Sequence, residues 1–447
     1  MYWRTLKILA KRPATSQLES WVCQKSYSSQ NTHARTVGKS SKPLRILFCG
    51  SDEFSSASLR AVYDEQRRDP NLIASIDVMC RPGKPSGRSL KTIREVPIKA
   101  VAEELGLPVH TRDTFTGWDS PKPQGQSINL IIAVSFGLFV PPRILRSAEY
   151  GGLNVHPSIL PNFRGPAPLQ YTIMTGAHHC GVTLQTLDEK SFDHGTILAH
   201  TQHLPIPLGK HCKYPDLLSF ITPIAASLLV DGLRSRVFVP PLINKGGLVA
   251  TTTTEQTGGV NIRKIITAPL HAPKITSADK RINWKDESVI PIERRHRALG
   301  RLWTEVLFDP ETKKRIFFED MELVDMPEAI TSLMAKRKET ETGLVEGSEE
   351  RTTVRFLAIS PKTAKENPRP RFFVSDGDAI IVACKGGAFR AKYITVEGKG
   401  RQHASRAFGG VEEWEQWDIR SDKFKLFLTP KRAQVDEGLG LAQKVGA

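Results

Sequence analysis

The sequence of 447 residues lacks the signatures of several common protein classes. Its six Cys form no CxxC pair, which argues against a disulfide scaffold and against a Cys-built zinc site. No apolar run reaches the ~18 residues of a membrane span, and the most apolar run, residues 128–140, is typical of a buried strand. We therefore expect reduced thiols and no membrane partner.

Several cofactor and catalytic motifs are also missing. The first apolar run ends in Gly50-Ser51-Asp52-Glu53 rather than in GxGxxG, which argues against a dinucleotide cofactor. The chain has no GxxxxGK[ST] P-loop, no HExxH zinc helix and no GxSxG elbow. His178-His179-Cys180 is a poor metal cluster, because adjacent residues of an extended chain point in opposite directions. The sequence therefore predicts a reaction that needs no metal.

Positive charge is abundant and unevenly spread. The formal net charge is +16, and residues 1–42 contain eight Lys or Arg and one Glu among many Ser. This composition predicts a disordered mitochondrial transit peptide over residues 1–42, and so a protein of the mitochondrial matrix; a plain basic tail is the alternative. The rest of the chain keeps a basic excess, which suggests a polyanionic partner.

Residues 43–234 alternate between strand and helix patterns. Such alternation is typical of βαβ units and predicts an α/β domain with a mostly parallel sheet. The expected strands are residues 44–50, 73–80, 128–135, 152–156 and 182–187, and the expected helices are residues 55–66, 96–106, 166–176 and 215–233.

Residues 235–271 are loop-like, and we interpret them as a linker. The pattern of apolar residues changes after this stretch. Short β-branched and aromatic runs separated by turns predict a small β-barrel over residues 272–410, with one preceding helix near residues 291–302. Residues 326–350 are charged and predict an exposed insertion. Residues 411–447 form a C-terminal tail.

The strand at residues 152–156 ends in a group of polar side chains. Asn154 and His156 are two residues apart, so they point to the same side of a strand. An amide and an imidazole can stabilise a carbonyl oxygen that becomes anionic, and His can move protons near neutral pH. Asp193 follows a later strand and could orient His156. An isolated Asn-x-His pair is more often structural, but rigid Pro- and Gly-rich loops at strand ends often build sites.

Two basic regions could contact phosphates. The loop at residues 81–91 carries Lys84, Arg88 and Lys91 among glycines, and a solvated surface loop is an equal alternative. Residues 351–410 hold 12 Lys or Arg against 4 Asp or Glu, which is typical of a β-barrel that binds nucleic acid.

Taken in order, these motifs resemble the methionyl-tRNA formyltransferases. The resemblance lies in RILFCGSDEF from residue 45, VSFGLFVP from residue 134, LNVHPSILPNFRGPAP from residue 153, GVTLQ from residue 181 and DHGTIL from residue 193. The segment Arg281-Ile282-Asn283-Trp284 resembles the start of that family's C-terminal domain.

The resemblance implies a Rossmann-like formyltransferase domain followed by an OB-like domain. It implies formyl transfer from 10-formyltetrahydrofolate to the α-amine of methionyl-initiator-tRNA by a protein that we expect to be a monomer. It gives catalytic roles to Asn154, His156 and Asp193. It assigns folate binding to Ser158, Ile159, Leu160 and Pro161, and contact with the tRNA acceptor stem to Arg88, which Lys84 and Lys91 flank.

Two departures from the family pattern bear on this assignment. The loop Asp188–Gly195 is one residue longer than usual and lacks its first Gly, so Asp188 is the alternative to Asp193. The insertion at residues 326–350 and the tail have no counterpart in the pattern.

Other functions remain open at this point. One alternative is another 10-formyltetrahydrofolate-dependent enzyme, acting on a purine precursor, an amino sugar or water. The basic C-terminal region argues against a single-domain enzyme of that kind. A second alternative is a non-catalytic RNA-binding factor, which would have no need to keep Asn154, His156 and Asp193 together.

Overall fold

The computed structural model describes residues 39–87, 91–246, 268–307, 313–339, 355–359 and 369–407. Several predicted features fall outside the described residues. They are Arg88 and, by range, most of the transit peptide (1–38), part of the linker (247–267), part of the insertion (340–350), the end of the barrel range (408–410) and the tail (411–447).

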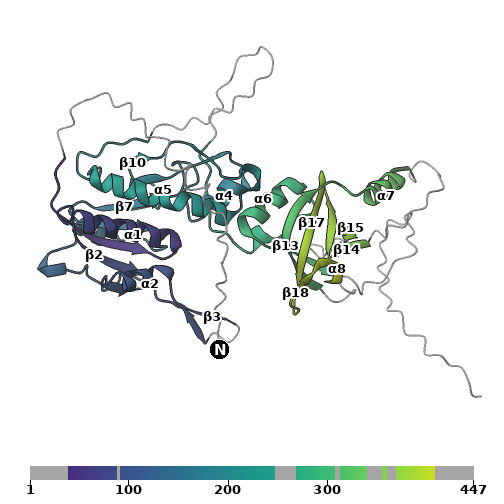
Figure 1. Cartoon of the computed structure of the whole chain (residues 1–447), viewed down its shortest axis with the longest axis horizontal. Helices are drawn as coiled ribbons and strands as arrows, with labels where there is room; N and C mark the ends of the chain where they lie inside the picture. Colours follow the sequence, from purple (N-terminus) through teal and green to yellow (C-terminus); the bar gives the residue numbers. More distant parts are fainter. Residues whose placement is uncertain are drawn as a thin grey trace, which may run out of the picture. The chain divides into compact units, whose positions relative to one another are not determined.

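The described chain begins with a seven-stranded sheet (Figure 1). Six of its strands point in the same direction, five of them as one parallel block, and the strand next to one edge runs antiparallel to both of its neighbours. The α/β class with a mostly parallel sheet is confirmed, whereas the short strands Val109–Thr111 and Ile197–His200 were not predicted. The order is β10 (Ile197–His200), β9 (Thr183–Thr186), β7 (Gly152–His156), β6 (Leu130–Val134), β1 (Leu44–Gly50), β2 (Ile73–Cys80) and β5 (Val109–Thr111).

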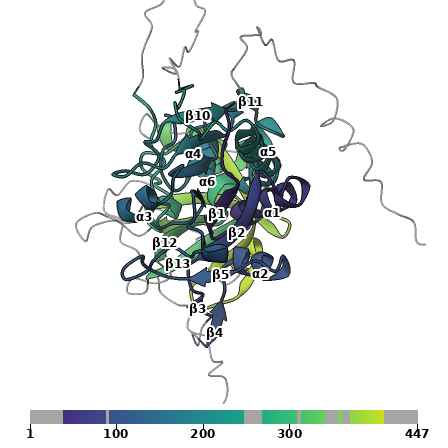
Figure 2. The same ribbon diagram turned by 90° about the vertical axis from the view of Figure 1, so that its left-hand side faces the viewer.

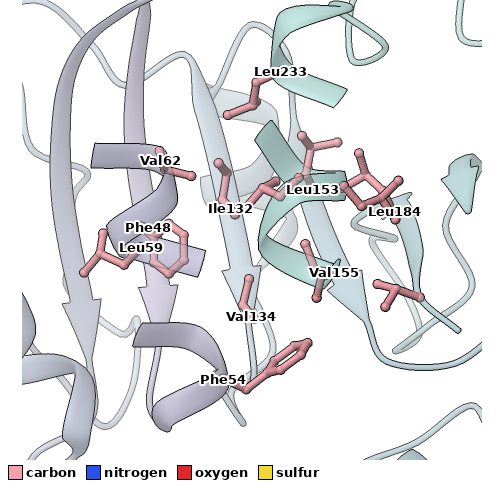
Figure 3. Close-up of a cluster of buried hydrophobic side chains, with 14 of the residues drawn as sticks. Phe48, Phe54, Leu59, Val62, Ile132, Val134, Leu153, Val155, Leu184 and Leu233 are labelled. Atoms are coloured by element: carbon pink, nitrogen blue, oxygen red, sulfur yellow. The ribbon is translucent and has the colours of Figure 1, made fainter. Parts of the chain in front are cut away.

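Helices α1 (Glu53–Arg68) and α5 (Tyr214–Arg234) cover one face of this sheet. Asp52 caps α1, because its carboxylate accepts the backbone N–H of Ser55. Apolar side chains from both helices and from β1, β6, β7 and β9 fill the layer between them (Figure 3). The other described helices of this part are α2 (Pro97–Glu104), α3 (Pro142–Ser147) and α4 (Pro168–Met174).

Helix α5 is long and apolar enough to cross a membrane by length and composition. Half of its apolar window is buried inside the protein, where Leu217, Ile221 and Leu229 are in the core. Glu65 of α1 accepts hydrogen bonds from Arg68 and from Arg234 of α5. These bonds, that from Arg68 first, lower the pKa of Glu65 to about 2. Helix α5 is thus tied to α1 by packing and by charge.

The second half of the described chain is an antiparallel barrel with α6 (Val289–Leu299) before it. The pairing of β13 with β17 closes six strands on themselves, so the predicted barrel is confirmed. The OB fold has five strands, so the OB type stays a prediction. The strands are β12 (Leu302–Leu307), β13 (Lys313–Val324), β14 (Arg355–Ile359), β15 (Arg369–Asp376), β16 (Ala379–Cys384) and β17 (Gly387–Val396), with β18 (Arg401–His403) added beside β17.

One expectation for this region was wrong, and one buried residue qualifies another. The helix predicted to reach residue 302 ends at Leu299, because Gly300 takes a positive φ of 72° and β12 starts two residues later. The insertion predicted to be exposed begins with α7 (Glu328–Glu339), in which Ile330 is fully buried against Val374 and Ala383. Ile330 therefore helps to anchor this charged helix to the barrel.

The remaining described elements are short. They are the hairpin β3 (Lys84–Ser86) with β4 (Thr92–Arg94), the pair β8 (His179–Cys180) with β11 (Leu204–Pro205), the helix α8 (Ala404–Ala407), and the 3-10 turns Pro123–Gly125, Gly209–His211 and Ala278–Lys280.

Candidate active site

The site forms at the carboxyl end of β7, next to the antiparallel strand β9. Asn154 Nδ2 donates to Asp193 Oδ1 over 3.0 Å, and His156 Nδ1 lies 3.4 Å from the same oxygen. The other ring nitrogen, His156 Nε2, lies 2.9 Å from the carbonyl oxygen of Phe163. The side chains of His156 and Asp193 are 7% and 9% exposed. The structure thus brings the three residues together around one largely desolvated carboxylate.

Asp193 takes an unusual backbone conformation to reach this position. Its φ is +58°, a left-handed value that costs free energy for a residue other than Gly. The carboxylate also accepts the Gly165 N–H on Oδ2 at 2.9 Å and the Gln185 amide on Oδ1 at 3.1 Å. Arg164 Nε donates to the Asp193 carbonyl at 2.8 Å. These bonds hold the strained residue in place.

Asp188, the alternative to Asp193, has a different environment. Its Oδ1 accepts the backbone N–H groups of Lys190 and Ser191 at 2.9 and 2.8 Å. These bonds, that from Lys190 first, lower the pKa of Asp188. Asp188 therefore shapes its own turn, whereas Asp193 is the carboxylate that Asn154 and His156 share.

The predicted folate segment divides into buried and half-buried residues. Ser158 and Leu160 are each 3% exposed, whereas Ile159 and Pro161 are half-buried. Thr183 of β9 holds the backbone of this segment: its hydroxyl donates to Ser158 O at 2.7 Å and accepts from Leu160 N at 3.1 Å. Ser158 Oγ donates to Asn162 O. Side-chain contact with a ligand is therefore open mainly to Ile159 and Pro161.

Near the site lies an exposed aromatic ring. Phe192, next to Asp193, is 60% exposed and meets Phe139 edge to face at 5.3 Å. Phe139 also lines an open pocket of about 450 Å³ with Phe115, Leu138 and Arg143. Aromatic surface beside convergent polar groups fits a flat, partly apolar co-substrate such as a folate.

Residues at the end of the predicted linker and just after it form backbone hydrogen bonds with residues 163–165, the loop segment that contacts His156 and Asp193. Phe163 N donates to Leu270 O at 2.6 Å, and Ala272 N donates to Arg164 O at 2.7 Å. Gly165 follows with a φ of 118°, and a Cβ there would overlap the carbonyl oxygen of Ala272. We call residues 270–272 the strap. It fixes the Phe163 carbonyl that faces His156 and the Gly165 N–H that binds Asp193.

The two described lysines of the basic loop, Lys84 and Lys91, are exposed. Lys84 starts β3 and Lys91 directly precedes β4, so both belong to one two-stranded hairpin. Figure 2 shows this hairpin extending beyond β5 and α2. It is well placed for contact with a large partner.

No metal site is evident among the described residues, where no three His, Cys, Asp or Glu side chains cluster suitably. His179 of the sequence cluster instead meets the ring of His203 at 6.2 Å. Cys49 and Cys80 are buried in the core, as expected, and burial raises the pKa of both thiols.

Sequence reasoning missed three contributors to the site. Arg164 and Gly165 lie inside a recognised motif, but their bonds to Asp193 depend on the loop's path. Gln185 stands opposite Asn154 in the β7–β9 pairing. Strand pairing would have revealed it, because directly opposed residues share a face of the sheet.

Comparison with known proteins gives consistent results. The family described as "Formyl transferase" matches residues 44–208. The mitochondrial methionyl-tRNA formyltransferase of Saccharomyces cerevisiae is 31% identical over 294 residues, which cover 58% of this chain and 69% of that protein. The mitochondrial enzyme of Bos taurus is 29% identical, with 68% of each chain covered. The methionyl-tRNA formyltransferase of Acidiphilium cryptum is 30% identical, covering 61% of this chain and 80% of that one.

The strap gives a stability prediction. In Gly165→Ala the new methyl group meets the Ala272 carbonyl at a φ that only Gly adopts readily, so we expect a loss of about 2–4 kcal/mol in the free energy of unfolding. Gly151→Ala is the matched control: φ there is 61°, and a Cβ added to it would have no atom of the described chain within 4 Å. Its cost should be about 1–2 kcal/mol. Urea denaturation of both variants measures the two losses in the free energy of unfolding. Equal losses would contradict a close contact between position 165 and the Ala272 carbonyl.

Proposed function

The chain belongs to the methionyl-tRNA formyltransferase family, and we propose that Asn154, His156 and Asp193 carry out its reaction. The protein transfers a formyl group from 10-formyltetrahydrofolate to the α-amine of methionyl-initiator-tRNA. A bond forms between the amine nitrogen and the formyl carbon, and the bond from that carbon to folate N10 breaks. The amine loses one proton and N10 gains one.

The observation that carries this assignment is the shared Asp193 carboxylate. Asn154 Nδ2 carries two hydrogens. One is donated in the hydrogen bond to Asp193, so the other is available for a hydrogen bond to the formyl oxygen. Both ring nitrogens of His156 face oxygen acceptors, so the imidazolium form can donate at both positions. We propose that the second hydrogen of Asn154 Nδ2 and the positive charge of the His156 imidazolium stabilise the negative charge that develops on the formyl oxygen. Asp193 keeps His156 oriented and removes the amine proton through a water.

We propose that Ile159 and Pro161 offer apolar surface to the folate. Their half-burial leaves part of each side chain for a ligand, whereas Ser158 and Leu160 shape the segment from inside. The ring pair Phe139 and Phe192 supplies further flat surface beside Asp193.

We propose that the β3–β4 hairpin contacts the acceptor stem of the tRNA through Lys84, Lys91 and Arg88. The exposure of both described lysines supports this role, because phosphate contacts come from cations that solvent can reach. The barrel is the second candidate surface for RNA. Two of its arginines, Arg281 and Arg315, lie over the ring of Trp303 at 5.4 and 5.9 Å, an arrangement also suited to stacking on a base.

The mitochondrial enzymes among the relatives support an organellar location. We propose that residues 1–42 direct the chain to the mitochondrial matrix, on the strength of their basic, acid-poor composition. We further propose that the protein acts as a monomer away from membranes, that its barrel is of the OB type, and that it serves initiation of organellar translation.

The first test is formyl transfer by the full chain, with 10-formyltetrahydrofolate and methionyl-initiator-tRNA. Uncharged tRNA and free methionine are the controls for the acceptor. Folate turnover without formylated tRNA would move the acceptor to a small amine or to water. Binding of tRNA without any turnover would favour a binding factor.

His156→Ala should lower kcat by about 10²-fold or more, because it removes the imidazolium charge that stabilises the developing oxyanion, an electrostatic effect worth about that much. Binding of the tRNA should stay within twofold of the wild type, since His156 is buried and is not part of the hairpin. His211→Ala, at an exposed position of the same domain, is the control for removal of a histidine. A kcat of His156→Ala near that of the control would refute the assignment.

Lys84→Ala combined with Lys91→Ala should weaken tRNA binding while leaving kcat at saturating tRNA unchanged. The logarithm of the tRNA association constant falls linearly with the logarithm of the salt concentration, and each lost phosphate contact reduces the magnitude of that slope by about 0.7–0.9. The slope of the double variant should therefore be smaller in magnitude by about 1.5. Lys122→Ala, an exposed lysine outside the hairpin, should change neither quantity. An unaltered slope for the double variant would show that the hairpin does not meet phosphates.

A further inference from the structure

Gln185 occupies a position that its sequence context leaves unexplained. It lies in β9 directly opposite Asn154 of β7, and opposed residues of an antiparallel pair place their side chains next to each other on one face. Both amides reach the same atom: Asn154 Nδ2 lies 3.0 Å and Gln185 Nε2 lies 3.1 Å from Asp193 Oδ1. Asp193 thus receives two amide donors from neighbouring strands.

The burial of Gln185 comes with an unpaired polar atom. The residue is fully buried, and its Oε1 has no hydrogen-bond partner in the described part of the chain. A buried carbonyl without a partner destabilises a folded protein, and the great majority of buried polar groups avoid that state. An apolar side chain of similar length, such as Met, would fill the same space without this cost. The glutamine is therefore poorly explained by stability alone.

The orientation of the amide follows from Asp193. Turning the amide over would place Oε1 against a carboxylate oxygen, two acceptors with no hydrogen between them. The carboxylate therefore selects the orientation in which Nε2 faces it and Oε1 is left unpaired. The hydrogen bond from Nε2 to Asp193 therefore leaves Oε1 of the same amide without a partner in the described part of the chain.

From this geometry we propose that Gln185 is a positioning residue of formyl transfer, which fixes the Asp193 carboxylate so that Oδ1 serves Asn154 and His156 together. The proposal rests on the proposed function of Asp193. Asp193 sits at a strained φ of +58°, so its side chain needs partners on both oxygens to stay in register. Gly165 N–H supplies the partner for Oδ2, and Gln185 with Asn154 supplies those for Oδ1.

The first experiment separates positioning from stability with Gln185→Met in the full chain. We expect kcat to fall by roughly 10- to 100-fold, because small displacements of a catalytic group have large effects on rate. KM for methionyl-tRNA should stay within twofold, and the midpoint of urea denaturation should be equal to or higher than that of the wild type. Gln202→Met makes the same chemical change at an exposed position and should alter none of these quantities.

A second variant, Gln185→Glu, adds a signature that a merely structural residue would not produce. The substituted carboxylate can donate to Asp193 only when the two carboxylates share a proton, which becomes more frequent as pH falls. The charged groups that the structure places here are His156 on the same oxygen and Arg164 on the Asp193 carbonyl. Rates are compared as the ratio of variant to wild type at each pH, and Gln185→Met, which adds no charge beside His156, gives the reference profile.

We expect that ratio to rise as pH falls from 8 to 6 for Gln185→Glu and to stay flat for Gln185→Met. A wild-type kcat retained by Gln185→Met, or a flat ratio for Gln185→Glu, would overturn the role of Gln185 while leaving formyl transfer intact. Absence of transfer in the wild type would instead overturn the proposed function itself. Circular dichroism of both variants confirms that each comparison is made on folded protein.

Discussion

The carboxylate of Asp193 is the point on which the site depends. Three segments meet at its two oxygens: β7 through Asn154 and His156, β9 through Gln185, and the loop after β7 through Gly165. Asp193 itself comes from the turn after β9. Charge-assisted hydrogen bonds in a desolvated setting are stronger than neutral bonds in water, so one residue can hold several segments in register. The strained backbone of Asp193 is the cost of that central position.

The rest of the fold supports this arrangement from a distance. The parallel strands direct β7 toward the site, and the packed layer under α1 and α5 makes the sheet rigid (Figure 3). The strap, residues 270–272, then binds the loop after β7 from the side of the linker. The segment that leads toward the barrel therefore touches the loop that faces His156.

Much of this could be predicted from the sequence, and the failures have definite causes. The strands at residues 44–50, 73–80 and 152–156 were predicted at their observed bounds. The two-residue spacing placed Asn154 and His156 on one side. Gln185 and the strap depend on which strands pair and how a loop returns, and a linear pattern carries neither. Strand β12 was missed because the predicted helix was extended past Gly300 to Leu302, whereas Gly300 ends the helix and the strand begins at Leu302.

The most direct test of the Asp193-centred account is a double-mutant cycle on kcat for formyl transfer, with Asn154→Ala, Asp193→Ala and the two combined. When two residues act as one unit, either substitution alone removes most of their joint contribution to kcat. The second substitution then lowers kcat little further. The account predicts that the double variant is slower than the slower single variant by no more than about threefold. Losses that multiply across the cycle would show that Asn154 works independently of Asp193 and would contradict the account.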